Sequence, residues 1–182
     1  MSRLFPALVA GLLFLGLGLG CSHYRLGTAT TLPFATLYVS PTTTKILLPQ
    51  GQAIITTQLR AAFLRDSRIT LVNSPEAADA TLDLEITDYR RDVATQRRDD
   101  TGLARKFSLY LTARGTLKDN RSGKVYFAQR EIIARRDAYT DSRFTLPSGS
   151  KISGQLQSEY QALPLLAEAL AEKVTHAALD VW

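Results

Sequence analysis

Two stretches of the chain alternate strictly between apolar and polar residues, and this pattern constrains the fold more than any other feature. The first stretch covers residues 80–87 and the second covers residues 107–114. A third, residues 125–134, alternates less cleanly. A period of two with one apolar face predicts half-buried strands of an antiparallel sheet. The polar run Asp119–Gly123 is a strong turn signal, so the second and third stretches should be neighbours.

Long polar segments separate these strands from each other and from the C-terminal part of the chain. The segment Arg90–Ala104 is a long polar loop between the first two strands, and we expect it to extend beyond the sheet as a protruding hairpin. A second polar loop should cover residues 141–153, which include Pro147 and Gly149.

Helical spacing of apolar residues marks two further segments. Residues 54–63 predict an amphipathic helix of about four turns that ends near Asp66. A long apolar stripe over residues 156–181 predicts a C-terminal helix. It contains Pro164, which is tolerated in a first helical turn, so we expect the main helix to begin near Leu163 after a kink or a separate turn.

Short extended segments complete the prediction. Residues 35–40 are rich in β-formers and precede Pro41, which predicts a first strand. Residues 69–72 indicate another short extended stretch. The order of these segments predicts an α+β fold, with two helices packed on one face of a mostly antiparallel four-stranded sheet. We assign residues 35–182 to this single domain.

The N-terminus carries a secretory pattern. After Arg3, the stretch Leu4–Leu19 contains only apolar residues, glycines and one proline. A basic start, an apolar run and a small residue before a cut site are typical of a signal peptide, which we place at residues 1–20. The segment that ends Gly20-Cys21 resembles a bacterial lipobox, although Gly18 stands where leucine is usual. The resemblance implies that Cys21 is lipidated and becomes the first residue of the mature protein.

Three other interpretations of this end remain open. The apolar run could span a membrane, but it is shorter than the roughly 20 residues that a span needs. It could be an ordinary signal cut elsewhere. Cys21 could also be a structural thiol or half of a disulfide, but it is the only cysteine. With lipidation, residues 21–34 form a tether. Ser22 is not the Asp that marks retention at the inner membrane, which implies a lipid-anchored place on the periplasmic side of the outer membrane.

Positive charge is concentrated in the middle of the chain. Residues 90–151 contain fifteen basic and seven acidic residues, a net +8, whereas the flanking mature segments are slightly acidic. For an exported protein this favours an anionic partner such as lipid phosphate, a glycan or an acidic protein surface, and argues against nucleic acid. The alternative is that these side chains only solvate exposed strand faces.

The residues do not suggest catalysis, a metal site or a cofactor. The two histidines, His23 and His176, lie far apart, the first in the tether and the second on the C-terminal helix. Neither stands in a pattern that pairs a base with a nucleophile or clusters metal ligands. Two carboxylate pairs, Asp83 with Glu85 and Asp99 with Asp100, fit an exposed strand face and a turn respectively. We therefore expect a protein that is not an enzyme.

Several weak motifs, taken in order, resemble one family. The chain has the lipobox, then Tyr24-Arg25-Leu26, a Leu71-Val72 stretch after the first helix, and an Ala78-Asp79-Ala80-x-Leu82 start to a strand. Gly123-Lys124-Val125 then begins a later strand. Over residues 21–182 this order resembles the LPS-assembly lipoproteins of the LptE family. The chain departs in having Ser22-His23 where glycine is common, so it resembles a distant member.

The resemblance implies a function and partners. LptE proteins lie at the inner face of the outer membrane, plug the large β-barrel LptD, help it to assemble, and help to deliver lipopolysaccharide to the cell surface. It also implies that a basic hairpin residue contacts lipopolysaccharide. The matching tentative contacts, with lipopolysaccharide or with the barrel, are Arg97 and Arg98, together with Arg91, Lys106 and Lys151. Their alternative role is to solvate the loops or to meet acidic residues of the barrel.

Two other functional classes remain alternatives. The chain could be an auxiliary lipoprotein of a lipid-transport ABC system, or another envelope-binding lipoprotein, because such proteins share the anchor and an α+β domain. It could also be an unrecognised envelope enzyme.

Overall fold

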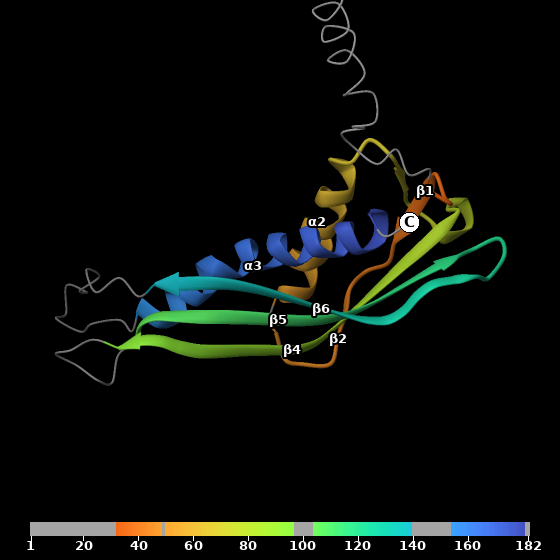
Figure 1. Cartoon of the computed structure of the whole chain (residues 1–182). Coiled ribbons are helices and arrows are strands. Elements are labelled where there is room, and N and C mark those ends of the chain that lie inside the picture. Colours follow the sequence, from red (N-terminus) through yellow and green to blue (C-terminus); the bar gives the residue numbers. More distant parts are fainter. Residues whose placement is uncertain (1–31, 49, 97–103, 140–153, 181–182) are drawn as a thin grey trace, which may run out of the picture. The chain divides into compact units, whose positions relative to one another are not determined.

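The computed structural model describes residues 32–48, 50–96, 104–139 and 154–180, which belong to one compact unit (Figure 1). Its elements are β1 (Thr36–Val39), β2 (Thr43–Thr44), α2 (Gly51–Leu64), β3 (Thr70–Val72), the 3-10 turn η1 (Pro75–Ala77), β4 (Ala80–Gln96), β5 (Ala104–Asp119), β6 (Val125–Tyr139) and α3 (Gly154–Leu179). Every segment that the sequence predicted as a strand or helix is present. The predicted N-terminal signal, tether and Cys21 lie outside the described residues.

The strands form one sheet in the order β3-β1-β4-β5-β6, with β2 also paired to β4. The long strands β4, β5 and β6 are antiparallel, whereas β1 pairs in parallel with both β3 and β4. The α+β class is confirmed, but the prediction of four strands is wrong because the sheet has six. Strand β2 has two residues and is too short to display an alternating pattern, whereas β3 corresponds to the extended stretch predicted over residues 69–72.

The expected hairpin is present as the antiparallel pair of β4 and β5, which extends to Gln96 and Ala104. The prediction that the loop begins at Arg90 is wrong, because Arg90–Gln96 belong to β4. A bulge explains the error. The register of β4 against β5 shifts between Ile86 and Asp88. The residues of β4 that face the helices are therefore even-numbered before this bulge and odd-numbered after it. Beyond the bulge, charged residues occupy both faces of β4, and the sequence there resembles a polar loop.

Both helices lie on one face of the sheet, as predicted (Figure 1). Helix α3 packs on β5, β6 and α2, and the two helices and the sheet share one apolar core. Its largest fully buried side chains include Leu37, Ile55, Leu59, Phe63, Leu109, Leu111, Leu166 and Leu170. In β5 the odd residues from Phe107 to Ala113 are all fully buried, so the helices cover this face of the strand.

Helix α3 is continuous from Gly154, so the expected helix start near Leu163 is wrong. Pro164 lies inside the helix and cannot donate the hydrogen bond to the carbonyl four residues before it. That carbonyl belongs to Tyr160, which is 59% exposed, and Pro164 is exposed as well. Water can therefore hydrate the free carbonyl, while Leu163 and Leu166 keep the opposite side of the helix in the core.

Candidate docking surface and the corner that frames it

The alternate residues of β4, β5 and β6 that point away from the helices form a second face of the sheet, which we call the open face. In β5 its members are the even residues from Lys106 to Lys118. Arg114 and Lys118 are exposed, and Tyr110 and Thr112 are half-buried. No described helix packs on this face, so those of its side chains that are exposed are available to a partner or to solvent.

Acidic and basic side chains alternate in rows across the open face. One row contains Arg90, Tyr110 and Arg135, which lie directly opposite one another on β4, β5 and β6. The guanidinium carbons of Arg90 and Arg135 lie 4.7 and 5.6 Å from the centre of the Tyr110 ring. Such cation–π contacts hold both arginine side chains against the sheet.

The next row carries negative instead of positive charge, with Asp92 and Asp137 on either side of Ser108. Asp137 accepts hydrogen bonds from Ser108 at 2.8 Å and from Arg135 at 3.3 Å. Lys106 lies 2.8 Å from its other carboxylate oxygen. These donors, Lys106 above all, lower the pKa of Asp137 to about 2.

A third row, nearer the bulge, places Arg114 between Glu85 and Glu131. Glu85 also pairs with Lys45 at 2.8 Å. Because carboxylates are interleaved with the basic side chains, the described open face is not a basic patch, although the segment that forms most of it has a large positive charge. Its arrangement suits a polar surface that presents both signs of charge.

The structure places two of the predicted contact residues on opposite faces. Lys106 belongs to the open face, where it pairs with Asp137 and lies 5.6 Å from the Tyr139 ring centre. Arg91 faces the helices instead, and its guanidinium group lies 2.7 Å from Glu159 of α3. The other three predicted contacts, Arg97, Arg98 and Lys151, lie outside the described residues.

Tyr89 shares the Glu159 carboxylate with Arg91. Its hydroxyl donates a hydrogen bond to Glu159 Oε1 at 2.5 Å. Burial and this carboxylate raise the pKa of Tyr89 well above its usual range, so the phenol stays protonated at neutral pH. The Arg91 charge is thus balanced within the fold, which joins β4 to α3 beyond the apolar core.

Sequence reasoning missed Tyr110, Arg90, Arg135 and Asp137 as members of one surface. In the sequence, Tyr110 is recognisable only as one of the polar positions of an alternating strand. The strand register that brings Arg90 and Arg135 to its ring depends on the bulge in β4 and on the β5–β6 turn. No local pattern in the sequence reports that register.

At the other end of the sheet, Asp79 joins three segments at one corner. Its Oδ2 accepts hydrogen bonds from the backbone N–H groups of Ala35 and Thr36, at 3.1 and 3.0 Å. Its Oδ1 lies 2.6 Å from Arg121 in the β5–β6 turn. The backbone donors, with Thr36 first, lower the pKa of Asp79. This explains why an aspartate precedes the first alternating strand.

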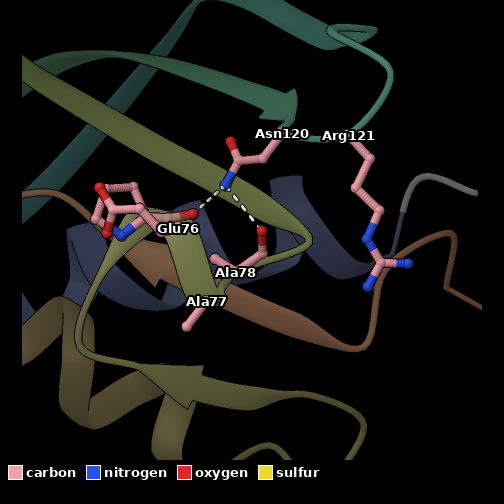
Figure 2. A pocket seen from close by; sticks show the side chains of 6 residues that line it. Glu76, Ala77, Ala78, Asn120 and Arg121 are labelled. Carbon is pink, nitrogen blue, oxygen red and sulfur yellow. Dashed lines mark hydrogen bonds between the residues drawn. The ribbon is translucent and has the colours of Figure 1, made fainter.

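Asn120 completes the corner, as Figure 2 shows. Its side-chain amide donates to the carbonyls of Pro75 and Ala78, at 2.8 and 3.0 Å, and its oxygen accepts from Thr81 at 2.9 Å. The surrounding hollow of about 390 Å³ is lined by η1 and by the turn. Asn120 and Arg121 both form their polar contacts within the protein. We therefore interpret the corner as a structural element that holds these segments together.

Of the candidate catalytic groups, Asp83, Glu85 and His176 occupy the places that the sequence suggested, whereas His23, Asp99 and Asp100 lie outside the described residues. Asp83 accepts from the Ser40 hydroxyl at 2.6 Å on an exposed strand position, and Glu85 pairs with Lys45. His176 is exposed on α3 and contacts Asp180. Within the described residues, no group of three or more histidine, cysteine or acidic side chains could hold a metal ion. None of the described helices is long and apolar enough to cross a membrane.

Residues 34–177 match the sequence model of the LptE lipopolysaccharide-assembly family. This match covers the whole sheet and nearly all of both helices. The chain belongs to the LptE family. The predicted resemblance is therefore confirmed, and a broad role in lipopolysaccharide assembly follows from membership. No curated protein has significant sequence similarity to the chain.

Solved structures with a similar arrangement are lipoproteins of low sequence identity. A minor lipoprotein of Acinetobacter baumannii is 18% identical, with 81% of this chain and 92% of that chain covered and a TM-score of 0.49. Lipoprotein B of Nitrosomonas europaea is 16% identical, with 86% and 95% covered and a TM-score of 0.48. The rare lipoprotein B of Shewanella oneidensis is 13% identical, with 79% and 93% covered and a TM-score of 0.40. Because all three TM-scores are below 0.5, the family assignment rests on the sequence match alone.

Proposed function

We propose that this protein is an outer-membrane lipoprotein that plugs the lipopolysaccharide translocon barrel LptD, assists the assembly of that barrel, and helps to deliver lipopolysaccharide to the cell surface. The observation that carries the proposal is the LptE family match over residues 34–177. In this account Cys21 carries the lipid anchor and holds the domain at the periplasmic side of the outer membrane.

The open face supports docking inside a barrel. Large outer-membrane barrels have polar interiors, in contrast to their apolar outer surfaces. The rows of alternating charge around Tyr110 would meet such a wall through many exchangeable polar contacts. An apolar face would instead require an apolar partner. We therefore propose that the open face lies against the barrel wall.

The basic loop residues would bind the lipid phosphates. Arg97 and Arg98, and in a second loop Lys151, fall where the family resemblance implies contact with lipopolysaccharide. Guanidinium groups bind phosphate through paired, charge-assisted hydrogen bonds. Arg91 and Lys106 would contribute only by exchanging the carboxylates of Glu159 and Asp137 for phosphate.

A charge-reversal experiment tests the phosphate contact. The double variant Arg97→Glu/Arg98→Glu should lose affinity for lipopolysaccharide while its thermal unfolding stays unchanged. The matched control is Lys118→Glu/Lys124→Glu, which removes two exposed positive charges near the β5–β6 turn. Unchanged affinity in the first variant, or an equal loss in both, would remove the proposed role of these arginines.

A pull-down of the tagged, membrane-extracted protein tests the plug. The unchanged protein should recover a large outer-membrane barrel in about equal amount. Thr112→Arg places a bulky charge in the middle of the open face and should reduce that recovery, whereas Glu172→Arg on the exposed side of α3 should not. Recovery of an inner-membrane transporter, or of no partner, would contradict the plug and favour an auxiliary lipoprotein.

A further inference from the structure

A groove of about 860 Å³ runs between the β2–α2 connection and the first turns of α2. It lies outside the open face and outside the corner around Asp79. The described residues that line it are Pro41, Thr42, Thr44, Ile46, Leu47, Leu48, Gln50, Gln52, Ala53, Thr56 and Thr57. None of them is charged. Isoleucine and leucine side chains lie beside threonine and glutamine in this lining, which suits an uncharged ligand with an apolar part rather than a phosphate or a metal ion.

The sequence around the groove is unusually poor in charge for a chain in which 21% of residues are charged. From Leu26 to Leu59 the only charged residue is Lys45. Lys45 is already paired with Glu85 at 2.8 Å, on the side of the open face. The segment that forms the groove therefore has few of the charges that normally keep a protein surface in water.

Leu47 is the most exposed large apolar residue among those described, at 95%. Its neighbours Ile46 and Leu48 are half-buried against the core. Leu48 packs where Gly51 has no side chain, since a Cβ at Gly51 would lie 2.4 Å from Leu48 Cδ2. The glycine thus lets Leu48 turn inward while Leu47 points into solvent.

Hydrogen bonds fix both ends of the segment that carries Leu47. The N–H of Thr42 donates to Thr56 Oγ1 at 3.0 Å, and the Gln52 amide donates to the Thr42 carbonyl at 2.6 Å. At the other end, the Tyr160 hydroxyl donates to Gln50 Oε1 at 2.7 Å. Leu47 therefore lies on a segment that hydrogen bonds hold in place at both ends. This lowers the entropy that is lost when a partner buries the Leu47 side chain.

We propose that Leu47 and this groove contact the hydrocarbon of the membrane leaflet near which Cys21 anchors the chain. Leu32 follows Cys21 by eleven residues, a length that spans at most about 40 Å when fully extended. A tether of this length confines the domain close to the leaflet and raises the effective concentration of lipid at Leu47. The fully exposed Leu47 favours hydrocarbon as the partner, and the uncharged lining disfavours a charged protein surface. This inference rests on the lipid anchor of the proposed function, and it concerns the anchored domain before a barrel encloses it, because a barrel wall would separate the groove from the leaflet.

Depth-dependent fluorescence quenching tests this contact in the mature chain from Cys21. The single cysteine allows coupling of residue 21 to a maleimide lipid, which places the anchor correctly whether or not the cell acylates it. The single tryptophan is removed by Trp182→Phe, and Leu47→Trp supplies the probe. The vesicles contain phosphatidylethanolamine and phosphatidylglycerol, with or without bromine on their acyl chains.

The matched control is Leu64→Trp in the same background. Leu64 is 71% exposed at the C-terminal end of α2, about 18 Å along the helix from Gln52. Circular dichroism confirms that both variants fold. In the Leu47→Trp variant, we expect membrane contact to blue-shift the fluorescence and brominated chains to quench it, whereas the Leu64→Trp variant should show neither change. Leu47→Glu should weaken vesicle binding of the uncoupled chain roughly tenfold.

Three results would overturn the proposal. The fluorescence of the Leu47→Trp variant could be the same on brominated and plain vesicles. The probes at positions 47 and 64 could be quenched equally, which would mean that the domain lies on the membrane without a preferred face. The probe at position 47 could also respond only when a purified outer-membrane barrel is added, which would assign the groove to a protein.

Discussion

The two faces of the three long strands β4, β5 and β6 differ sharply in the side chains that they carry. On the face covered by helices, Phe107, Leu109 and Leu111 are completely buried. On the open face the intervening residues, such as Tyr110 and Thr112, lie among charged neighbours. The same backbone thus carries a core on one side and a charged surface on the other.

This difference separates stability from function. Buried apolar side chains each contribute a few kcal/mol, whereas an exposed ion pair contributes about 0–1 kcal/mol. The open face can therefore change its partners at little cost to the fold. We infer that the covered face sets the stability of the domain and that the open face sets what it binds.

Substitution of neighbouring residues on β5 should give the largest contrast. Leu111→Ala removes a completely buried side chain and should lower the free energy of unfolding by about 3 kcal/mol. Thr112→Ala, one residue further on the open face, should change it by no more than about 0.5 kcal/mol. Urea unfolding of both variants measures the difference. Equal losses would show that the open face also carries stability.

The corner around Asp79 should behave like the covered face although its bonds are polar. Asp79→Ala leaves the N–H groups of Ala35 and Thr36 and the Arg121 guanidinium without their acceptor. We expect a loss of about 2 kcal/mol. Glu76→Ala, on exposed η1 nearby, is the control and should be nearly neutral. A neutral Asp79→Ala would mean that the corner does not hold the start of β1.

A single substitution on the open face should have a small effect. Arg135→Ala removes a cation–π contact with Tyr110 and a hydrogen bond to Ser108. The residue is exposed, so the expected loss is about 0.5 kcal/mol. Thermal unfolding in low and high salt measures it. A loss comparable to that of Leu111→Ala would break the distinction between the two faces.

The smallest expected effect is a pH dependence that comes from Asp137. Its pKa is about 2 in the folded protein, because Lys106 and Ser108 stabilise the charged carboxylate. The folded pKa lies below the unfolded value of about 3.9. Its stabilisation is therefore present above about pH 4 and is lost as the pH falls toward 2. Asp137→Asn should be slightly less stable than the unchanged protein at pH 6, and the difference should vanish near pH 2. A difference that persists at pH 2 would contradict the assignment.

The sequence predicts the covered face well and the open face poorly. Apolar residues in alternation on β5 and at helical spacing on α2 report burial directly, and Ile55, Leu59 and Phe63 are indeed fully buried. The pairing of Arg90 and Arg135 around Tyr110 depends instead on strand register, which a bulge in β4 resets. Register is a long-range property, so the charged rows emerge only from the folded sheet.

Two local errors have the same origin. The sequence placed a loop after Tyr89 because charges occupy both faces of β4 beyond the bulge, yet pairing with β5 continues to Gln96. It placed a helix start near Pro164 because proline usually breaks a helix, yet packing of Leu166 and Leu170 on the sheet keeps α3 continuous. In both cases tertiary contacts override a local preference.

Site-specific photo-crosslinking tests most directly whether the open face is the docking surface. A photoreactive residue at Thr112, in the centre of that face, is compared with one at Glu172, on the exposed side of α3. Our account predicts that the probe at position 112 crosslinks to a large outer-membrane barrel in living cells, more strongly than the probe at position 172. Crosslinks from position 172 alone, or from neither position while the barrel still co-purifies, would contradict it.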